Sequence, residues 1–137
     1  MKGGLIERVA VLTGRRSEDP RGWLHVALGA SQLPADAAFG ELYVIQADDV
    51  GVRRGDHYHR QMHEWFSVVQ GKATLQLRDP VSDERLAIPL NAKVPRTVGV
   101  PAGIAHCFVN DGPGPMIVVA WASAEHDPAD VVPCVAG

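Results

Sequence analysis

Two separated segments of this 137-residue chain contain the side chains best suited to a small metal-binding or acid–base site. The first contains His57, His59 and Glu64, and the second begins at Pro101 and contains His106. Side chains alternate between the two faces of a β-strand, so His57 and His59 are expected to point the same way. Imidazole nitrogens and a carboxylate oxygen are ligands for zinc, iron, manganese or nickel, and four such groups leave positions open for water or a substrate. The pattern therefore predicts that these four side chains share one pocket.

The residues between the two leading histidines and Glu64 must redirect the chain. Glu64 lies an odd number of residues from both histidines, so an unbroken strand would point it to the opposite face. We therefore expect a bend or a bulge within residues 60–62. His63 and Glu64 are neighbours on the following strand, so at most one of them faces the pocket, and alternation alone does not decide which. A single histidine in a strand is more often structural, and His25 and His126 are interpreted in that way.

Short apolar segments separated by turn residues predict an all-β chain. Fourteen glycines and ten prolines interrupt the sequence, and no long stretch has helical periodicity. Residues 73–78 alternate between apolar and polar side chains, and a turn at 79–83 predicts a hairpin with the next strand. Residues 30–38 and the tail after Ala124 are expected to form loops or short helices. Strands are expected at residues 6–12, 23–27, 39–45, 56–59, 64–70, 73–78, 85–88, 97–100, 106–110 and 116–121.

Length and composition limit the classes of protein. The length predicts a single domain, residues 1–137. A net charge of −3 and a pI near 6.0 predict no binding to nucleic acid or to membrane surfaces. Residues 1–12 lack the uninterrupted apolar core of a secretory signal, so a cytoplasmic location is expected. Cys107 and Cys134 have neither a metal-binding spacing nor a disulfide framework, and Cys107 is expected to pack on the face opposite His106.

The two motifs resemble the two conserved motifs of the cupin superfamily. The first extends from Gly51 to Gly71 and the second from Pro101 to Asn110. The resemblance implies a double-stranded β-helix, a jelly-roll barrel with a core of about residues 39–122. It also implies that the barrel forms a homodimer. The inward-pointing metal ligands that it implies are His57, His59, Glu64 and His106.

Residues 19–127 resemble a narrower branch of this superfamily. They are similar to nucleotide-sugar 3,4-ketoisomerases, to dTDP-4-dehydrorhamnose 3,5-epimerases and to the cupin domain of capsular-polysaccharide assembling enzymes. The resemblance implies an isomerase or epimerase that acts on a keto-sugar nucleotide without an organic cofactor. Such ketoisomerases usually work without metal, whereas this chain retains the full ligand set. The runs that carry the likeness are Asp19-Pro20-Arg21-Gly22-Trp23-Leu24 and Arg54-Gly55-Asp56-His57-Tyr58-His59.

Proton transfer next to a ketone is the chemistry expected of such a site. A base removes an α-proton, a cation or a hydrogen-bond donor stabilises the enolate, and the proton returns to a different carbon or face. In a metal-free site, His57 or His59 is the candidate base. If a metal ion is bound to those histidines, it polarises the carbonyl, and the candidate bases are Tyr58, Tyr43 and His63.

Other residues and other functions stay open at this point. Guanidinium groups match phosphate geometry, so four arginines are candidates for binding a substrate diphosphate, and Tyr43 is a further candidate for substrate binding. One alternative function is a metal-dependent oxygenase or lyase that acts on a small organic acid. Another is a sugar-binding module without catalysis. The four arginines are Arg21, Arg54, Arg60 and Arg78.

Overall fold

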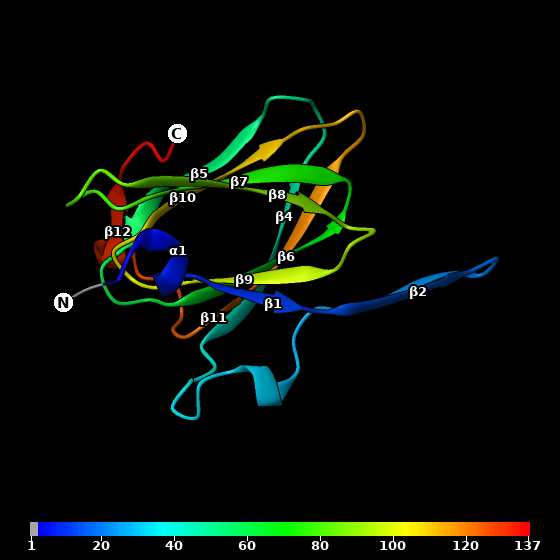
Figure 1. Cartoon of the computed structure of the whole chain (residues 1–137), viewed down its shortest axis with the longest axis horizontal. Helices are drawn as coiled ribbons and strands as arrows, with labels where there is room; N and C mark the ends of the chain where they lie inside the picture. Colours follow the sequence, from blue (N-terminus) through cyan, green and yellow to red (C-terminus); the bar gives the residue numbers. More distant parts are fainter. Residues whose placement is uncertain (1–2) are drawn as a thin grey trace.

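Two antiparallel sheets packed face to face make up the body of the protein (Figure 1). The structure is a computed structural model, and it describes residues 3–137. The all-β prediction is confirmed. The elements in chain order are α1 (Leu5–Arg8), β1 (Ala10–Thr13), β2 (Arg15–Asp19), β3 (Gly22–Val26), η1 (Ala30–Gln32), β4 (Glu41–Ala47), β5 (Arg53–His59), β6 (Glu64–Gln70), β7 (Lys72–Arg78), β8 (Arg85–Asn91), β9 (Arg96–Val100), β10 (Ala105–Asn110), β11 (Met116–Ala122), η2 (Pro128–Asp130) and β12 (Val131–Pro133).

The strand order identifies the predicted double-stranded β-helix. The first sheet has the order β1-β9-β6-β11-β4, and the second has the order β12-β5-β10-β7-β8. From β4 to β11 the chain crosses repeatedly between the sheets, and only the β7–β8 hairpin stays within one of them. This hairpin is the one that the turn at residues 79–83 predicts. The jelly-roll barrel is thereby confirmed.

The interior of the barrel follows from the period-two pattern of its strands. Leu75 and Leu77 are fully buried, as the alternation in residues 73–78 predicts. The rings of Phe66 and Phe108 meet edge to face across the two sheets, with centroids 5.1 Å apart. These apolar side chains fill one part of the space between the sheets and leave the part beside β4 and β5 for polar groups.

The N-terminal region differs from the prediction of one strand at residues 6–12. Residues Leu5–Arg8 form one helical turn, and only Ala10–Thr13 pairs with β9. Leu5 is fully buried and its N–H donates to the Glu84 carboxylate at 2.9 Å, so tertiary contacts override the local strand preference. Among the described residues, no helix has the length and apolar character needed to span a lipid bilayer.

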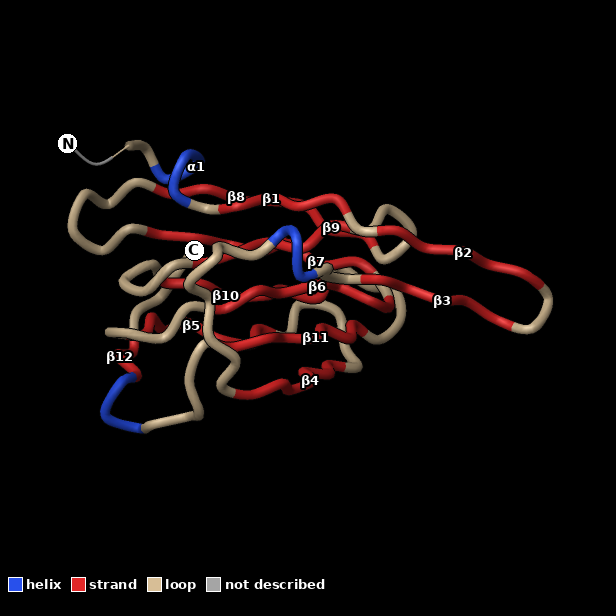
Figure 2. The backbone as a smooth tube through the Cα atoms, turned by 90° about the horizontal axis from the view of Figure 1, so that it is seen from below, coloured by secondary structure: helices blue, strands red, loops and turns tan. Residues whose placement is uncertain are grey.

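Two strands were missed by the sequence analysis. The first, β2, is polar and pairs with β3 in a hairpin that projects well beyond the two sheets (Figure 2). The second, β12, lies in the tail expected to be loop or short helix, and it pairs with β5 at the edge of the second sheet. The tail therefore contributes directly to the wall of the barrel, next to the strand that carries His57 and His59.

Candidate metal and proton-transfer site

A cavity of about 470 Å³ opens between the edge strand β4 of one sheet and strands β5 and β12 of the other. Most of the side chains around it are polar or ionisable, in contrast to the apolar interior beside it. Its lining residues are Glu41, Tyr43, His57, His59, Met62, Glu64, His126 and Val131.

Three imidazoles and one carboxylate converge at the inner end of this cavity. One nitrogen each from His57, His59 and His106 lies within 4.8 Å of the other two. Strand pairing explains part of this arrangement, because His106 of β10 lies directly opposite His57 of β5. Glu64 comes from β6 in the facing sheet, and its Oε1 lies 3.0 Å from His59 Nε2 and 3.4 Å from His106 Nε2. The structure thus brings together the four residues predicted to share a pocket.

Glu64 is almost completely buried, and only one of its two carboxylate oxygens accepts a hydrogen bond. The Tyr43 hydroxyl donates a hydrogen bond to Oε2. The other oxygen, Oε1, is buried and accepts no hydrogen bond of acceptable geometry, although two imidazole nitrogens lie close to it. An unsatisfied buried carboxylate oxygen is costly, because it has lost its water without gaining a partner.

The far side of two of the imidazoles is held by the protein. Asp130 Oδ2 lies 3.1 Å from His59 Nδ1, and the same carboxylate accepts the backbone N–H groups of Gln61 at 2.7 Å and Met62 at 3.3 Å. His106 Nδ1 lies 3.3 Å from the Ile104 carbonyl oxygen. Both contacts suit an Nδ1–H donor, which leaves Nε2 free to bind a metal ion. Asp130 was missed by the sequence analysis, because nothing in the local sequence connects η2 with His59.

The bend between His59 and Glu64 is a crossover between sheets. Residues 60–63 carry the chain from the end of β5 to the start of β6, so the bend expected at 60–62 is present and no bulge is needed there. Glu64 faces the cavity, and the exposed His63 points to the outer side, where its ring stacks on Trp65 at 5.5 Å. The pairing of β5 with β10 contains a register shift instead, because His106 lies opposite His57 and Cys107 lies opposite Gly55, which leaves Asp56 of β5 as the extra residue.

Gly55 allows this register shift. Its φ is +125°, and a Cβ there would lie 2.6 Å from the His106 carbonyl oxygen. A side chain would therefore push β10 away from β5 and displace His106. The glycine matters for the site because it lets the strand that carries His57 approach the strand that carries His106.

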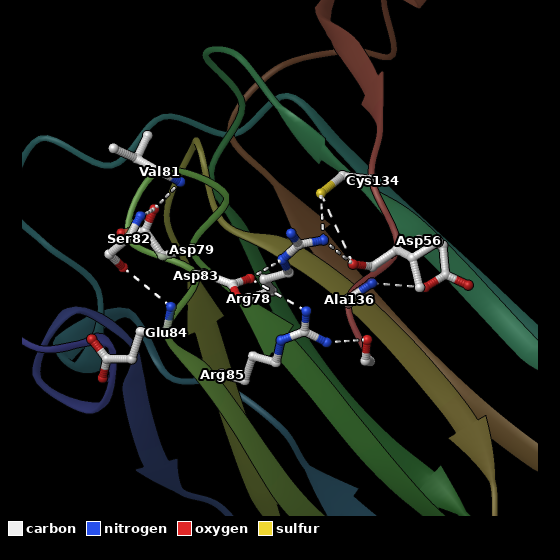
Figure 3. A network of polar contacts seen from close by, with 12 residues as sticks. Asp56, Arg78, Asp79, Val81, Ser82, Asp83, Glu84, Arg85, Cys134 and Ala136 are labelled. Atoms are coloured by element: carbon white, nitrogen blue, oxygen red, sulfur yellow. Dashed lines mark hydrogen bonds and ion pairs between the residues drawn. The ribbon is translucent and has the colours of Figure 1, made fainter.

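Several predicted site residues lie elsewhere. Tyr58 packs on the outer side of the second sheet against the cluster that includes Cys107 and Ala136. Arg78 donates to Asp83 and to the Val135 carbonyl, in the network that holds the C-terminal segment (Figure 3).

The remaining arginines also differ in their distance from the cavity. Arg54 donates to the Gln46 carbonyl at 3.1 Å, and Arg21 pairs with Asp19 in the projecting hairpin. Arg60 lines a second cavity of about 300 Å³, which shares Met62 with the first. His126, interpreted from the sequence as structural, lines the first cavity itself.

Residues 18–131 match the model of a protein family described as the polysaccharide biosynthesis C-terminal domain. The chain belongs to this family. It is 32% identical over 77 residues to UDP-2-acetamido-2,6-beta-L-arabino-hexul-4-ose reductase of Pseudomonas aeruginosa. That match covers 56% of this chain and 21% of the reductase, so the chain spans about a fifth of the length of this curated relative.

Solved structures confirm the cupin fold of this family member. The sugar 3,4-ketoisomerase QdtA from Thermoanaerobacterium thermosaccharolyticum, in complex with TDP, superposes with a TM-score of 0.75 and 23% identity, over 93% of this chain and 89% of that one. The 3,5-epimerase RmlC from Legionella pneumophila superposes with a TM-score of 0.80 and 19% identity, over 94% and 73%. A dTDP sugar isomerase from Desulfovibrio desulfuricans gives 0.81 and 19%, over 95% and 85%. At these identities the likeness establishes the shared fold.

Burial and neighbouring charges set the protonation of the converging groups. Burial lowers the pKa of His106 to about 4, and burial followed by the nearby His59 lowers the pKa of His57. Burial also acts to lower the pKa of His59, but the carboxylates of Glu64 and Asp130 outweigh it and raise this pKa overall. Burial acts to raise the pKa of Glu64, yet His59, His106 and Tyr43 outweigh it and keep the carboxyl ionised.

The residues at the inner end of this cavity fit a divalent metal ion. Three imidazole nitrogens lie close enough together to share one ion, and an ionised carboxylate places an unsatisfied oxygen beside two of them. Asp130 and the Ile104 carbonyl hold two of the imidazoles in the orientation that metal-bound histidines have. Three nitrogens and one oxygen form a donor set suited to zinc, iron, manganese or nickel.

Proposed function

We propose that this chain catalyses the isomerisation or epimerisation of a keto-sugar nucleotide by proton transfer next to the carbonyl, with a divalent metal ion held by His57, His59, Glu64 and His106. The observation that carries the proposal is the buried Glu64 oxygen that lacks a hydrogen bond and lies within 3.4 Å of two imidazole nitrogens. A metal ion would supply the missing partner.

The sugar part of the proposal is supported by the relatives. The QdtA structure is a sugar 3,4-ketoisomerase with TDP, and the RmlC structure is an epimerase with dTDP-4-keto-L-rhamnose. The curated relative is named as a reductase of a UDP-linked hexulose. Each of these names includes a nucleotide-linked sugar, and the two enzymes of known fold rearrange a sugar without net oxidation.

The residues of this chain would divide the work between positioning and water exclusion. Asp130 orients His59, and Tyr43 orients Glu64 through its hydroxyl. Met62 and Val131 provide apolar walls that exclude water from the cavity. His57, His59, Glu64 and His106 would hold a divalent ion whose positive charge would supply polarisation of a substrate carbonyl. Arg60, beside the adjoining cavity, and Tyr43 stay candidates for substrate binding.

In a metal-free scheme, His57 or His59 would itself be the base. We favour the metal-bound scheme because a base needs one free imidazole, whereas the structure gathers three of them around an unsatisfied carboxylate oxygen. The two schemes differ in what the purified protein contains. Elemental analysis therefore separates them.

The test combines metal analysis with hydrogen exchange. The protein is purified without added metal, its metal content is measured, and it is incubated in D₂O with TDP-4-keto-6-deoxyglucose and with UDP-linked 4-keto-hexoses. We expect one divalent ion per chain and deuterium at a carbon next to the carbonyl, detected by NMR. We expect Glu64→Gln to lose the metal.

Three outcomes would contradict the proposal. Metal-loaded protein that exchanges no carbon-bound hydrogen in any of these sugars would exclude the reaction. Full exchange by metal-free protein would exclude the metal. Redox-active iron together with oxygen consumption would favour the oxygenase alternative.

We also propose that a second copy of the chain covers the outer face of the first sheet. Leu42 and Val44 of β4 are exposed there, beside an apolar cavity of about 520 Å³, and Trp23 and Leu24 are exposed on the projecting hairpin. One surface thus carries both a projection and a hollow, and a two-fold interface brings the same surface patch of both copies together. Analytical ultracentrifugation should show a dimer for the wild type and a monomer for Val44→Glu. A monomeric wild type would refute this.

A cytoplasmic location stays a prediction, which cell fractionation would test.

A further inference from the structure

We propose that His126 exchanges the proton with the substrate at the mouth of the cavity, as the acid–base group of the reaction proposed above, on which this inference rests. His126 lies on the loop between β11 and η2, about twenty residues after the last predicted metal ligand.

The cavity lining leaves few groups available for proton transfer once the metal ligands are assigned. Tyr43 also lines the cavity, but its hydroxyl donates a hydrogen bond to the Glu64 carboxylate. The hydroxyl therefore holds a metal ligand in place and is not directed at a substrate. Of the ionisable lining residues in the described part of the chain, Glu41 and His126 remain.

The other bases suggested by the sequence are in the wrong place. Tyr58 packs on the outer side of the second sheet. The exposed His63 stacks on Trp65, on the outer side of the first sheet. Neither lines the cavity, so neither ring can reach a carbon atom of a substrate bound beside Glu64.

The loop that carries His126 is tied to the barrel on both sides. The His126 N–H donates to Glu41 Oε1 at 2.6 Å, which fixes the loop to the start of β4. Before it, the Ser123 N–H donates to the His63 carbonyl at 2.9 Å. After it, the Asp130 carbonyl accepts the Arg60 N–H at 2.8 Å, which fixes the loop to the end of β5. The backbone is therefore anchored although the side chain is exposed.

The ring of His126 is free for chemistry. Among residues 3–137, the hydrogen bonds and ion pairs of the structure engage its backbone and leave its two ring nitrogens without a protein partner. Glu41, in contrast, already uses one carboxylate oxygen to hold this loop. The arrangement makes Glu41 a positioning residue and His126 the group that meets the substrate.

The proton transfer balances without any further reactant. A ring nitrogen of neutral His126 takes the proton from the carbon next to the carbonyl, the C–H electron pair moves into the new carbon–carbon double bond, and the carbonyl becomes an enolate. The protonated ring then returns the proton to the former carbonyl carbon, while the hydroxyl proton of the neighbouring carbon passes to the former carbonyl oxygen, so that the carbonyl has moved by one carbon. Imidazole is the side chain most often used for such transfer near neutral pH. None of the metal ligands then needs to act as the base that removes the substrate proton.

The test compares His126→Ala with His63→Ala, which removes an exposed histidine that lies outside both cavities. Exchange of carbon-bound hydrogen for deuterium is followed by NMR with the keto-sugar nucleotide that the wild type exchanges fastest. We expect His126→Ala to be slower by about 10²–10⁴-fold, with an unchanged metal content and thermal midpoint. Added imidazole should restore part of the rate. His63→Ala should stay within about threefold of the wild type, as expected for an exposed histidine that touches no reacting group.

The outcomes separate this inference from the proposed function. A wild type that exchanges, together with a His126→Ala variant within about threefold of it, would overturn the role of His126 and leave the function standing. Loss of exchange accompanied by loss of metal, without rescue by imidazole, would assign His126 a structural role and also overturn the inference. A wild type that exchanges none of the sugars would overturn both.

Discussion

Protonation of His106 should destabilise the metal-free protein as the pH falls from 6.5 towards 4. Burial lowers the pKa of this imidazole to about 4 in the folded state, although the Glu64 charge opposes the shift. Between these pH values the unfolded chain binds a proton that the folded chain excludes, so the free energy of unfolding falls with the pH. Each tenfold change in proton affinity corresponds to about 1.4 kcal/mol, so His106 alone should remove about 3 kcal/mol by pH 4.

Urea unfolding followed by tryptophan fluorescence would measure this effect in chelator-treated protein. The comparison is between the wild type and His106→Asn, at several pH values from about 4 to 7. His59 acts in the opposite sense, because its raised pKa stabilises the fold at low pH and loses that contribution as the pH rises through the folded-state value. The difference between the two proteins isolates His106. Parallel pH profiles would refute the argument that burial keeps His106 neutral.

Two further substitutions test how the site is positioned. Asp130→Asn should weaken Zn²⁺ binding by about 10- to 100-fold, because an amide cannot replace the carboxylate that holds His59. Isothermal titration would measure it, and unchanged affinity would show that Asp130 does not orient the ligand. Gly55→Ala should destabilise the fold by about 1–3 kcal/mol, because its backbone lies in the left-handed region and its Cβ would press on His106. A thermal midpoint equal to that of the wild type would contradict the close approach of β5 and β10.

The barrel could be predicted where the strands have one buried and one exposed face. Residues 73–78 show this alternation, and β7 has the predicted buried face and the predicted hairpin with β8. Elements that are held in place by residues distant in sequence show no such alternation, so they could not be predicted. The helical turn at Leu5–Arg8 depends on the burial of Leu5 and its bond to Glu84, and β12 depends on the open edge of β5.

The inner part of the site could also be predicted, because the spacing of His57 and His59 places both on one strand face. The choice between His63 and Glu64 could not, because it depends on how the chain turns between two sheets, and the structure places Glu64 inside. Asp130 and His126 could not be found either. His126 reaches the cavity, and Asp130 reaches His59, through the packing of the tail against β4 and β5. No local spacing connects either residue with the motif residues.

The crossing of the chain between the two sheets has a consequence for how the protein acquires its activity. The groups around the cavity come from β4, β5, β6, β10 and the tail, so none of them meets the others until most of the strand pairings have formed. Topologies dominated by such distant pairings fold slowly, because the entropy cost of closing the long loops arises before the stabilising contacts form. The functional centre should therefore be one of the last parts of the protein to form during folding. A metal ion that binds there would stabilise the completed barrel over its nearly folded precursors.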